Sequence, residues 1–414
     1  MDRQSGTDAG TARSGPPKRR SGDLPAGSSA QAGPAPPRAA RAAVSVVFFV
    51  TGAAFATWAA RVPAVQDRLD LSEGRLAVAL VGLSGGAFLG LPLVGGLVAR
   101  LGSRPVLFAG LTLYLSALAG LAFVPGLPLL TVTLALFAFG NTAVDVAMNT
   151  QGVLVERAYG RVVLGGFHAM FSLGGIAGAA LGSLAAAQGL GTDRHFTAVA
   201  LALAALAALA ATALLPDRRA PVPAAADRAP LLALPGPGLW IPGFVAFCAL
   251  MGEGVMNDWG AVYLRDTAGA SPGTAGAGFA VFSAGMVLGR LSADRIRART
   301  GTAGFVRGCA LLAAVGAVVP VVFPVPAAGL AGYTLLGLGL AAVIPVVFSH
   351  AAALRPERPG PAIAAVSAVG YLGFLAGPPV IGGLAEAVEL RAAMLVPLVL
   401  TATMAALSVR LRRT

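Results

Sequence analysis

The composition of this chain excludes an ordinary soluble protein. Of its 414 residues, 56% are apolar and only 12% are charged, and the formal net charge is +12. Soluble globular chains carry about 25% charged residues, and this composition also excludes a disordered protein or a coiled coil. About 20 apolar residues span a bilayer, so the chain is long enough for twelve such segments with short connections.

The first 41 residues differ from the rest of the chain. Residues 1–41 are rich in Gly, Pro, Ala, Ser and Arg and hold almost no large apolar side chain. Such a segment cannot bury enough surface to offset the entropy of ordering, so we expect a disordered tail in the cytoplasm. A cleaved signal peptide is disfavoured, because its apolar region would begin unusually late and further apolar segments follow.

Twelve apolar segments follow and predict twelve membrane-spanning helices. They are 42–60, 74–98, 105–124, 128–153, 164–187, 196–215, 240–262, 274–293, 303–323, 327–349, 361–384 and 391–409. We expect an all-α membrane protein of two six-helix, pseudo-symmetric bundles. The N-terminal bundle covers 42–215, a cytoplasmic loop 216–238, the C-terminal bundle 239–410 and a cytoplasmic end 411–414.

The basic residues support this count and give the orientation. If the connections alternate from a cytoplasmic N-terminus, 24 of the 30 Lys and Arg residues fall on the inner side and six on the outer side. This is the positive-inside bias of membrane proteins. It predicts a multi-pass protein of the inner (cytoplasmic) membrane with both termini in the cytoplasm. It also accounts for the positive charge without a nucleic acid partner.

The two sets of six segments resemble each other. Three landmarks recur in the second half at offsets of 199 to 201 residues: Trp58 and Trp259, Ser72 and Ser271, Gly174 and Gly373. The two serines are typical helix N-caps, and each glycine begins a Gly-xxx-Gly spacing that favours close helix packing. A six-plus-six parallel repeat predicts a substrate site between the halves, near the middle of the membrane.

A motif between the second and third segments resembles the major facilitator superfamily. Residues 95–105, GGLVARLGSRP, are similar to its G-x-L-A-D-R-x-G-R-R signature, with Ala99 in place of the usual Asp. The second-half copy over 289–295, GRLSADR, keeps the Asp. The resemblance implies the major facilitator fold and secondary transport.

Three further stretches resemble the YbjJ-type branch of that superfamily, which is similar to the fucose permease group of sugar:proton symporters. They are NTAVDVAMN over 141–149, GFHAMFSLGG over 166–175 and EGVMNDW over 253–259. The resemblance implies a mechanism class and names no solute.

Asp145 is the main candidate for proton coupling. A carboxylate at the bilayer centre costs about 2.5–3.5 kcal/mol on insertion scales, so it must face protein or a water-filled cavity. Asn141 and Asn149, four residues to either side, form one helical stripe with it. In the fucose permease group, a carboxylate at the matching place is implicated in proton coupling. The structural alternative is a buried Asp satisfied by neighbouring donors.

Glu253 and His168 are further candidates for proton coupling. Glu253 lies near the middle of its segment, and Asn257, four residues on, shares its face. His168 carries an imidazole that titrates near neutral pH and could pair with Asp145 or donate to a sugar hydroxyl. For each of them a satisfied packing role is the alternative.

The remaining candidates bind the solute or form a gate. For solute binding we expect Asn141, Asn149, Asn257, Trp58 and Trp259, although an aromatic belt at the headgroups is the favoured alternative for both Trp residues. For an inner gate we expect Arg100, Arg104, Asp294 and Arg295, although topology alone also explains the arginines.

No motif for an ATP motor or an enzyme occurs, and Cys248 and Cys309 lack partners for a metal site or a disulfide. We therefore expect no catalytic residue, no cofactor and no metal. No Lys or Arg lies deep in a segment, since Arg61 and Arg290 lie at the rims, and this disfavours anionic solutes.

The sequence as a whole predicts a monomeric secondary active transporter that moves a small polar, sugar-like solute across the inner membrane by alternating access. Transport is expected to be coupled to protons, with symport as the leading mechanism. Two alternatives stay open. One is proton-driven efflux of drugs or metabolites, and the other is a non-transporting membrane sensor on the same fold.

Overall fold

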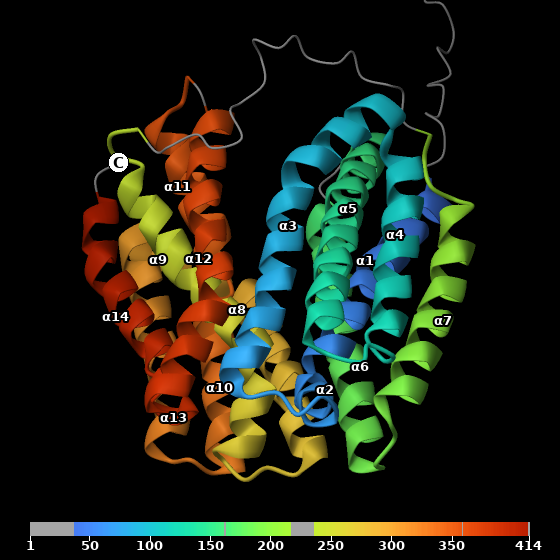
Figure 1. The fold of residues 1–414 in the computed structure, drawn as a ribbon. Helices are drawn as coiled ribbons and strands as arrows, with labels where there is room; N and C mark the ends of the chain where they lie inside the picture. The colour runs from blue at the N-terminus through green and yellow to red at the C-terminus, as the bar shows by residue number, and fades with distance from the viewer. Residues whose placement is uncertain (1–36, 161–162, 217–235, 358, 413–414) are drawn as a thin grey trace, which may run out of the picture. The chain divides into compact units, whose positions relative to one another are not determined.

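The computed structural model describes residues 37–160, 163–216, 236–357 and 359–412. The described residues are helical and hold no strand (Figure 1). Of the expected tail, residues 1–36 lie outside this part, and the first helix begins at Arg38. Of the expected central loop, residues 217–235 lie outside it as well.

The first half of the described chain follows the first six predicted segments. Its helices are α1 (Arg38–Ala59), α2 (Val62–Arg68), α3 (Glu73–Leu101), α4 (Ser103–Gly120), α5 (Leu127–Tyr159), α6 (Leu164–Ala187) and α7 (Thr192–Ala211). The short helix α2 is an addition to the prediction. It lies in the connection between α1 and α3 and has Pro63 in its first turn, where a missing N–H costs nothing.

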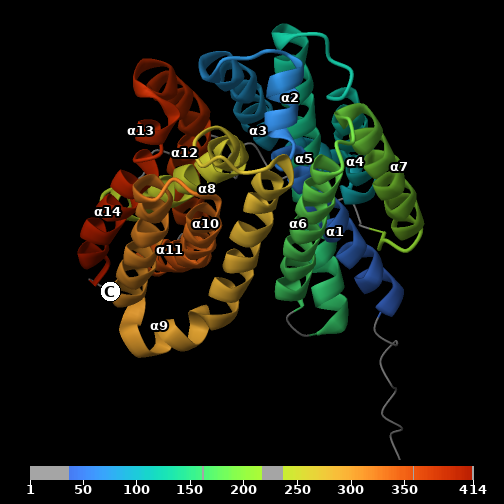
Figure 2. The same ribbon diagram turned by 90° about the horizontal axis from the view of Figure 1, so that it is seen from below.

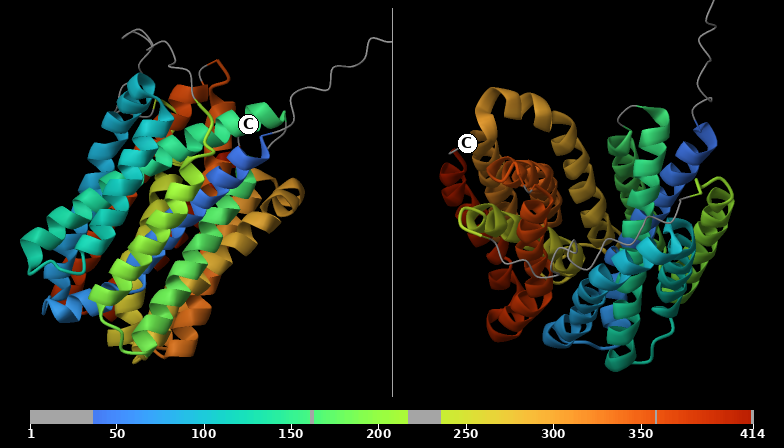
Figure 3. Two further views of the ribbon diagram at one scale, coloured as in Figure 1. Left: turned by 90° about the vertical axis from the view of Figure 1, so that its right-hand side faces the viewer. Right: turned by 90° about the horizontal axis from the view of Figure 1, so that it is seen from above.

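The second half follows the other six predicted segments. Its helices are α8 (Trp240–Asp266), α9 (Pro272–Val322), α10 (Pro326–Leu340), α11 (Val343–Leu354), α12 (Pro359–Val388), α13 (Leu390–Ala393), α14 (Val396–Ser408) and the 3-10 turn η2 (Val409–Arg412). One long helix, α9, covers two predicted segments. Gly301 interrupts it with a φ of 70°, and its two limbs are visible in Figures 2 and 3.

Ten helical stretches of the described chain are long and apolar enough to cross a membrane. Helices α4 and α8 are not among them, although both coincide with predicted segments. Helix α8 contains Glu253, Asp258 and Arg265. Its polarity distinguishes α8 as a helix that must face something other than lipid.

The helices pack as two sets that meet along two lines. In the first set α1 packs on α6, and α5 packs on both α3 and α4. In the second set α8 packs on α12, and α9 packs on α10. The sets touch where α6 lies beside the first limb of α9 and where α3 lies beside α12 (Figures 1 and 2).

The predicted helix caps are present. The Ser72 hydroxyl accepts a hydrogen bond from the backbone N–H of Arg75 at the start of α3. At the equivalent place in the second half, the Ser271 hydroxyl accepts one from the N–H of Thr274 at the start of α9. The two halves thus begin corresponding helices in the same way.

Glycines allow close helix contacts, as the Gly-xxx-Gly spacing predicted. A Cβ on Gly174 of α6 would collide with the carbonyl oxygen of Phe49 in α1. In the second half, a Cβ on Gly373 of α12 would collide with the carbonyl oxygen of Phe247 in α8. The same backbone-to-backbone contact therefore holds one helix pair in each half.

Candidate functional site

A cavity of about 310 Å³ lies between the two sets of helices. Its walls come from α1, α3, α5 and α6 of the first half and from α8, α9 and α12 of the second. Its polar lining side chains are Ser84, Asn141, Thr142, Asp145, Ser172, Glu253, Asn257, Asp258, Ser283, Arg290 and Tyr371. The volume lies at the lower end of the range of about 300–1,000 Å³ that is usual for small-molecule sites.

Asp145 of α5 opens into this cavity and is held by its own helix. The Asn149 amide donates to Oδ1 of Asp145 at 3.1 Å and to the Asp145 carbonyl oxygen at 2.9 Å. Asn141, one turn earlier, lines the cavity, and its Oδ1 has no hydrogen-bond partner among the described residues. Two members of the predicted stripe thus face the cavity, and the third, Asn149, supports Asp145 without lining the cavity.

Helix α8 brings two more carboxyl groups to the same cavity. Glu253 and Asn257 line it, and so does Asp258. Neither acid has a hydrogen bond or an ion pair within the described part of the chain. Asp258 was not among the predicted site residues. The insertion cost that singled out Glu253 applies to it equally, so the sequence held the signal that would have found it.

Arg290 of α9 also lines the cavity, which corrects the expectation that no cation reaches the site. Its Nε donates to the carbonyl oxygen of Ala341 and its Nη1 donates to Oγ of Ser172, both at 3.3 Å. The sequence placed Arg290 at the rim because the apolar segment ends at residue 293. Helix α9 continues to the break at Gly301, so Arg290 lies well inside a helix. Its bond to Ser172 in α6 connects the two halves.

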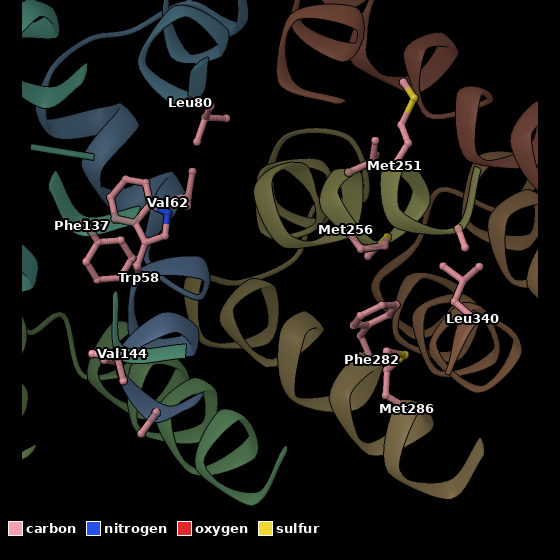
Figure 4. Packing of buried hydrophobic residues seen from close by; sticks show 14 of the residues in the cluster. Trp58, Val62, Leu80, Phe137, Val144, Met251, Met256, Phe282, Met286 and Leu340 are labelled. Atoms are coloured by element: carbon pink, nitrogen blue, oxygen red, sulfur yellow. The ribbon is translucent and has the colours of Figure 1, made fainter. Parts of the chain in front are cut away.

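Aromatic rings from both halves complete the walls. They belong to Phe55, Phe88, Phe137, Phe171, Phe279, Phe282, Phe374 and Tyr371. Tyr371 of α12 lies within electrostatic reach of both Asp145 and Glu253. Figure 4 shows Phe137 of α5 apart from Phe282 and Met286 of α9, and all three line the cavity. The acids of the two halves therefore share one aromatic chamber.

His168 does not lie on the cavity wall. Its ring packs edge-on against Phe48, with ring centroids 5.1 Å apart. It is within electrostatic reach of Arg290, but no contact with Asp145 occurs in the described residues. The structure therefore places His168 beside the site and not in it.

Trp58 and Trp259 are interior residues. Their exposed fractions are 1% and 0%, so they lie neither in a headgroup belt nor on the cavity surface. The indole Nε1 of each has no hydrogen-bond partner among the described residues. Figure 4 shows Trp58 within the apolar cluster, near Phe137. Trp58 and Trp259 are thus equivalent packing residues of the two halves, since both are buried in the hydrophobic core.

The expected inner gate shows no ion pair in the described side chains of Arg100, Arg104 and Arg295. The side chain of Asp294 lies outside the described part. Among the described residues, an ion pair joins the halves at the other end, where Nη1 of Arg265 contacts Oδ1 of Asp67 at 2.7 Å. Arg265 of α8 also donates to the Pro63 carbonyl oxygen at 2.7 Å and to Oε1 of Gln66 at 3.1 Å.

Other contacts between the halves lie at the same end, which we call the closed end. The N–H of Gly74 in α3 donates to Oε2 of Glu386 in α12 at 2.9 Å. The Ser183 hydroxyl of α6 donates to the Gly273 carbonyl oxygen of α9. A Cβ on Gly382 of α12 would collide with the side chain of Ala77 in α3. Both lines of contact between the halves are therefore tight at the closed end.

Comparisons with known proteins agree with this architecture. The family model described as Major Facilitator Superfamily matches residues 43–332 and 243–414. An uncharacterized MFS-type transporter of Yersinia pestis is 35% identical over 357 residues, which cover 84% of this chain and 89% of that protein. The uncharacterized transporter y4wD of Sinorhizobium fredii is 36% identical over 348 residues, which cover 84% and 92%.

Solved structures show the same fold. A mutant of the nucleoside transporter NupG superposes with a TM-score of 0.76 at 14% identity, over 90% of this chain and 100% of that one. The MFS transporter FucP in its outward conformation superposes with a TM-score of 0.58 at 16% identity, over 90% and 98%.

Two sets of membrane helices around a cavity lined by both polar and aromatic side chains define a multi-pass membrane transporter for small solutes. The chain belongs to the major facilitator superfamily. The predicted fold class and family are confirmed.

Proposed function

We propose that this chain is a proton-coupled secondary transporter that moves a small polar solute by alternating access. The observation that carries the proposal is the meeting of Asp145, from one half, and Glu253, from the other, in one cavity. Asn141 and Asn257 lie beside them as neutral hydrogen-bonding groups. Protonation removes the charge of a carboxyl group and so lowers the cost of closing an apolar cavity around it.

In this proposal the two bundles, over 42–215 and 239–410, rock about the cavity, and the loop 216–238 links them. The contacts at the closed end shut one side. The positive-inside bias supports a closed end on the outer side of the inner membrane, with both termini in the cytoplasm. The chain acts as a monomer, because each monomer carries a complete cavity.

Individual residues take the following roles in the proposal. Asp145 is the main proton carrier and Glu253 the second. Asn141 and Asn257 contact the solute, and Asn149 positions Asp145. His168 influences the site through its electrostatic interaction with Arg290.

Solute-induced proton movement tests the proposal. Purified protein in liposomes with a trapped pH dye meets a panel of sugars, polyols, nucleosides, amino acids and amines. One class of solute is expected to move protons, in a direction that also reveals symport or exchange. Asp145→Asn should abolish the signal. Asp70→Asn makes the same chemical change on an exposed loop residue outside the cavity and should retain it.

Two results would contradict proton coupling. In one, a solute enters the liposomes with no proton movement. In the other, Asp145→Asn and Glu253→Gln both keep the wild-type proton signal.

A further inference from the structure

The cavity holds an excess of acid over base. Three carboxyl groups line it, those of Asp145, Glu253 and Asp258, against the guanidinium of Arg290. Among the described lining residues Arg290 is the single Lys or Arg. Within the described residues, the titratable groups around the site are these four, Tyr371 of α12, and His168 of α6, which lies within electrostatic reach of Arg290. With its acids ionised, the lining therefore carries net negative charge.

Arg290 does not neutralise this excess. Two of its nitrogen atoms donate to uncharged oxygens, the Ala341 carbonyl and the Ser172 hydroxyl. No ion pair joins Arg290 to a carboxylate within the described part of the chain, although Glu253 lies in its electrostatic field. Asp145 has only the neutral amide of Asn149 as a side-chain partner, and Asp258 has none in that same part. Two carboxyl groups are thus left for a positive charge that comes from outside the protein.

The spacing of the acids favours an organic cation over a bare ion. Within the described residues, no three His, Cys, Asp or Glu side chains come close enough together to hold one metal ion. The rest of the wall is aromatic, and Phe55 of α1 faces Phe279 of α9 with ring centroids 5.9 Å apart. Aromatic faces attract ammonium groups, and the attraction grows when water is excluded. A compact protonated amine suits both the unpaired carboxyl groups and the aromatic wall.

We propose that the solute is a small organic cation, a protonated amine whose charge pairs with Asp258 and Asp145 and whose body packs among the aromatic rings. The inference rests on the proposed function of the same cavity. The cavity volume of about 310 Å³ restricts the solute to compact molecules. The amine and protons then compete for the same carboxylates, so the amine binds more weakly as the pH falls.

Matched pairs of ligands test the charge directly on the wild-type protein. Phenethylamine and 2-phenylethanol differ by an ammonium in place of a hydroxyl, and so do glucosamine and glucose. Binding to the full-length protein in detergent is measured by titration calorimetry at neutral pH. In at least one pair the amine should bind at least about tenfold more tightly than its neutral partner. The ammonium group pairs with a carboxylate of the cavity, which the alcohol leaves unpaired.

Variants locate the binding charge. Asp258→Asn and Asp145→Asn should each weaken binding of the amine by about tenfold or more and leave the neutral partner unchanged. Asp70→Asn should alter neither. Thermal unfolding of each variant shows whether the chain has folded, and the wild-type comparison of each pair stands without the variants.

The results separate this inference from the proposed function. If no amine binds more tightly than its neutral partner, the inference is wrong, even when a neutral sugar or nucleoside drives proton movement in liposomes and so supports proton-coupled transport. If amines bind and enter liposomes without protons, the cation inference holds and proton coupling is wrong. Equal amine binding by wild type, Asp258→Asn and Asp145→Asn would also overturn the inference.

Discussion

Arg290 connects the two halves of the molecule through a single side chain. It lies in α9, and it donates to Ser172 in α6 and to the carbonyl oxygen after α10, at Ala341. Arg290→Lys keeps the charge but loses the planar set of donors that reaches both oxygens. We expect its initial rate of transport to fall by about tenfold, with a larger loss for Arg290→Ala. Initial uptake at saturating solute measures the effect.

Ser172→Ala removes one of these bonds and keeps Arg290. A hydrogen bond to a charged group contributes about 1.5–3 kcal/mol. At 3.3 Å this bond lies at the weak end of that range, so its loss should lower the rate by no more than about tenfold. Wild-type rates in Arg290→Lys would show that the charge alone is needed and that the connection between the halves is dispensable.

At this scale the sequence pointed to two of the three acids that line the cavity and missed the third, Asp258. Asp145 and Glu253 are conspicuous because apolar segments rarely keep a carboxylate. The phenylalanines of the wall are inconspicuous for the opposite reason, since Phe is equally suited to lipid and to a cavity. Trp58 and Trp259 lie near the ends of their segments, where Trp is typical of membrane surfaces, and only three-dimensional packing places them in the interior.

Helix pairing depends on single glycines at the scale of the elements. Gly174→Ala would press a methyl group against the backbone of α1. Overpacking of this kind costs about 1–3 kcal/mol, so the melting temperature in detergent should fall. Gly165→Ala is a matched control on the same helix, because no atom lies within 4 Å of its added Cβ. A melting temperature for Gly174→Ala equal to that of Gly165→Ala would contradict the close α1–α6 contact.

All twelve predicted segments lie on helices, because long apolar runs leave the backbone no partner but itself in a membrane. The prediction missed the short helix α2 and the continuation of α9 from residue 293 to Gly301. The hydropathy pattern marks where the apolar part of a helix ends, but the helix itself can continue beyond that point. This is also why Arg290 was expected at a rim.

At the scale of the whole molecule, the contacts at the closed end keep one side of the cavity shut. Arg265→Gln removes the ion pair with Asp67. The pair is partly exposed, so we expect a modest shift of a few-fold toward a state open at this end. The readout is the labelling rate of Ser183→Cys by a membrane-impermeant thiol reagent, in a chain whose Cys248 and Cys309 are replaced by Ala.

Labelling should be faster with Arg265→Gln and unchanged with Arg75→Gln, a substitution of the same kind on an exposed residue of α3. Equal labelling in both would mean that the Arg265 network does not hold the closed end.

Neighbouring glycines of α12 have unlike surroundings at that end. Gly382 lies against Ala77 of α3, whereas an added Cβ on Gly383 would meet no atom within 4 Å. A methyl group at Gly382 therefore acts as a wedge between the halves, while one at Gly383 does not. In the same labelling assay Gly382→Ala should speed the reaction and Gly383→Ala should not. In the proposed carrier, we therefore expect the resting balance between its two states to depend on the absence of a side chain at Gly382, so that one added carbon atom would shift it.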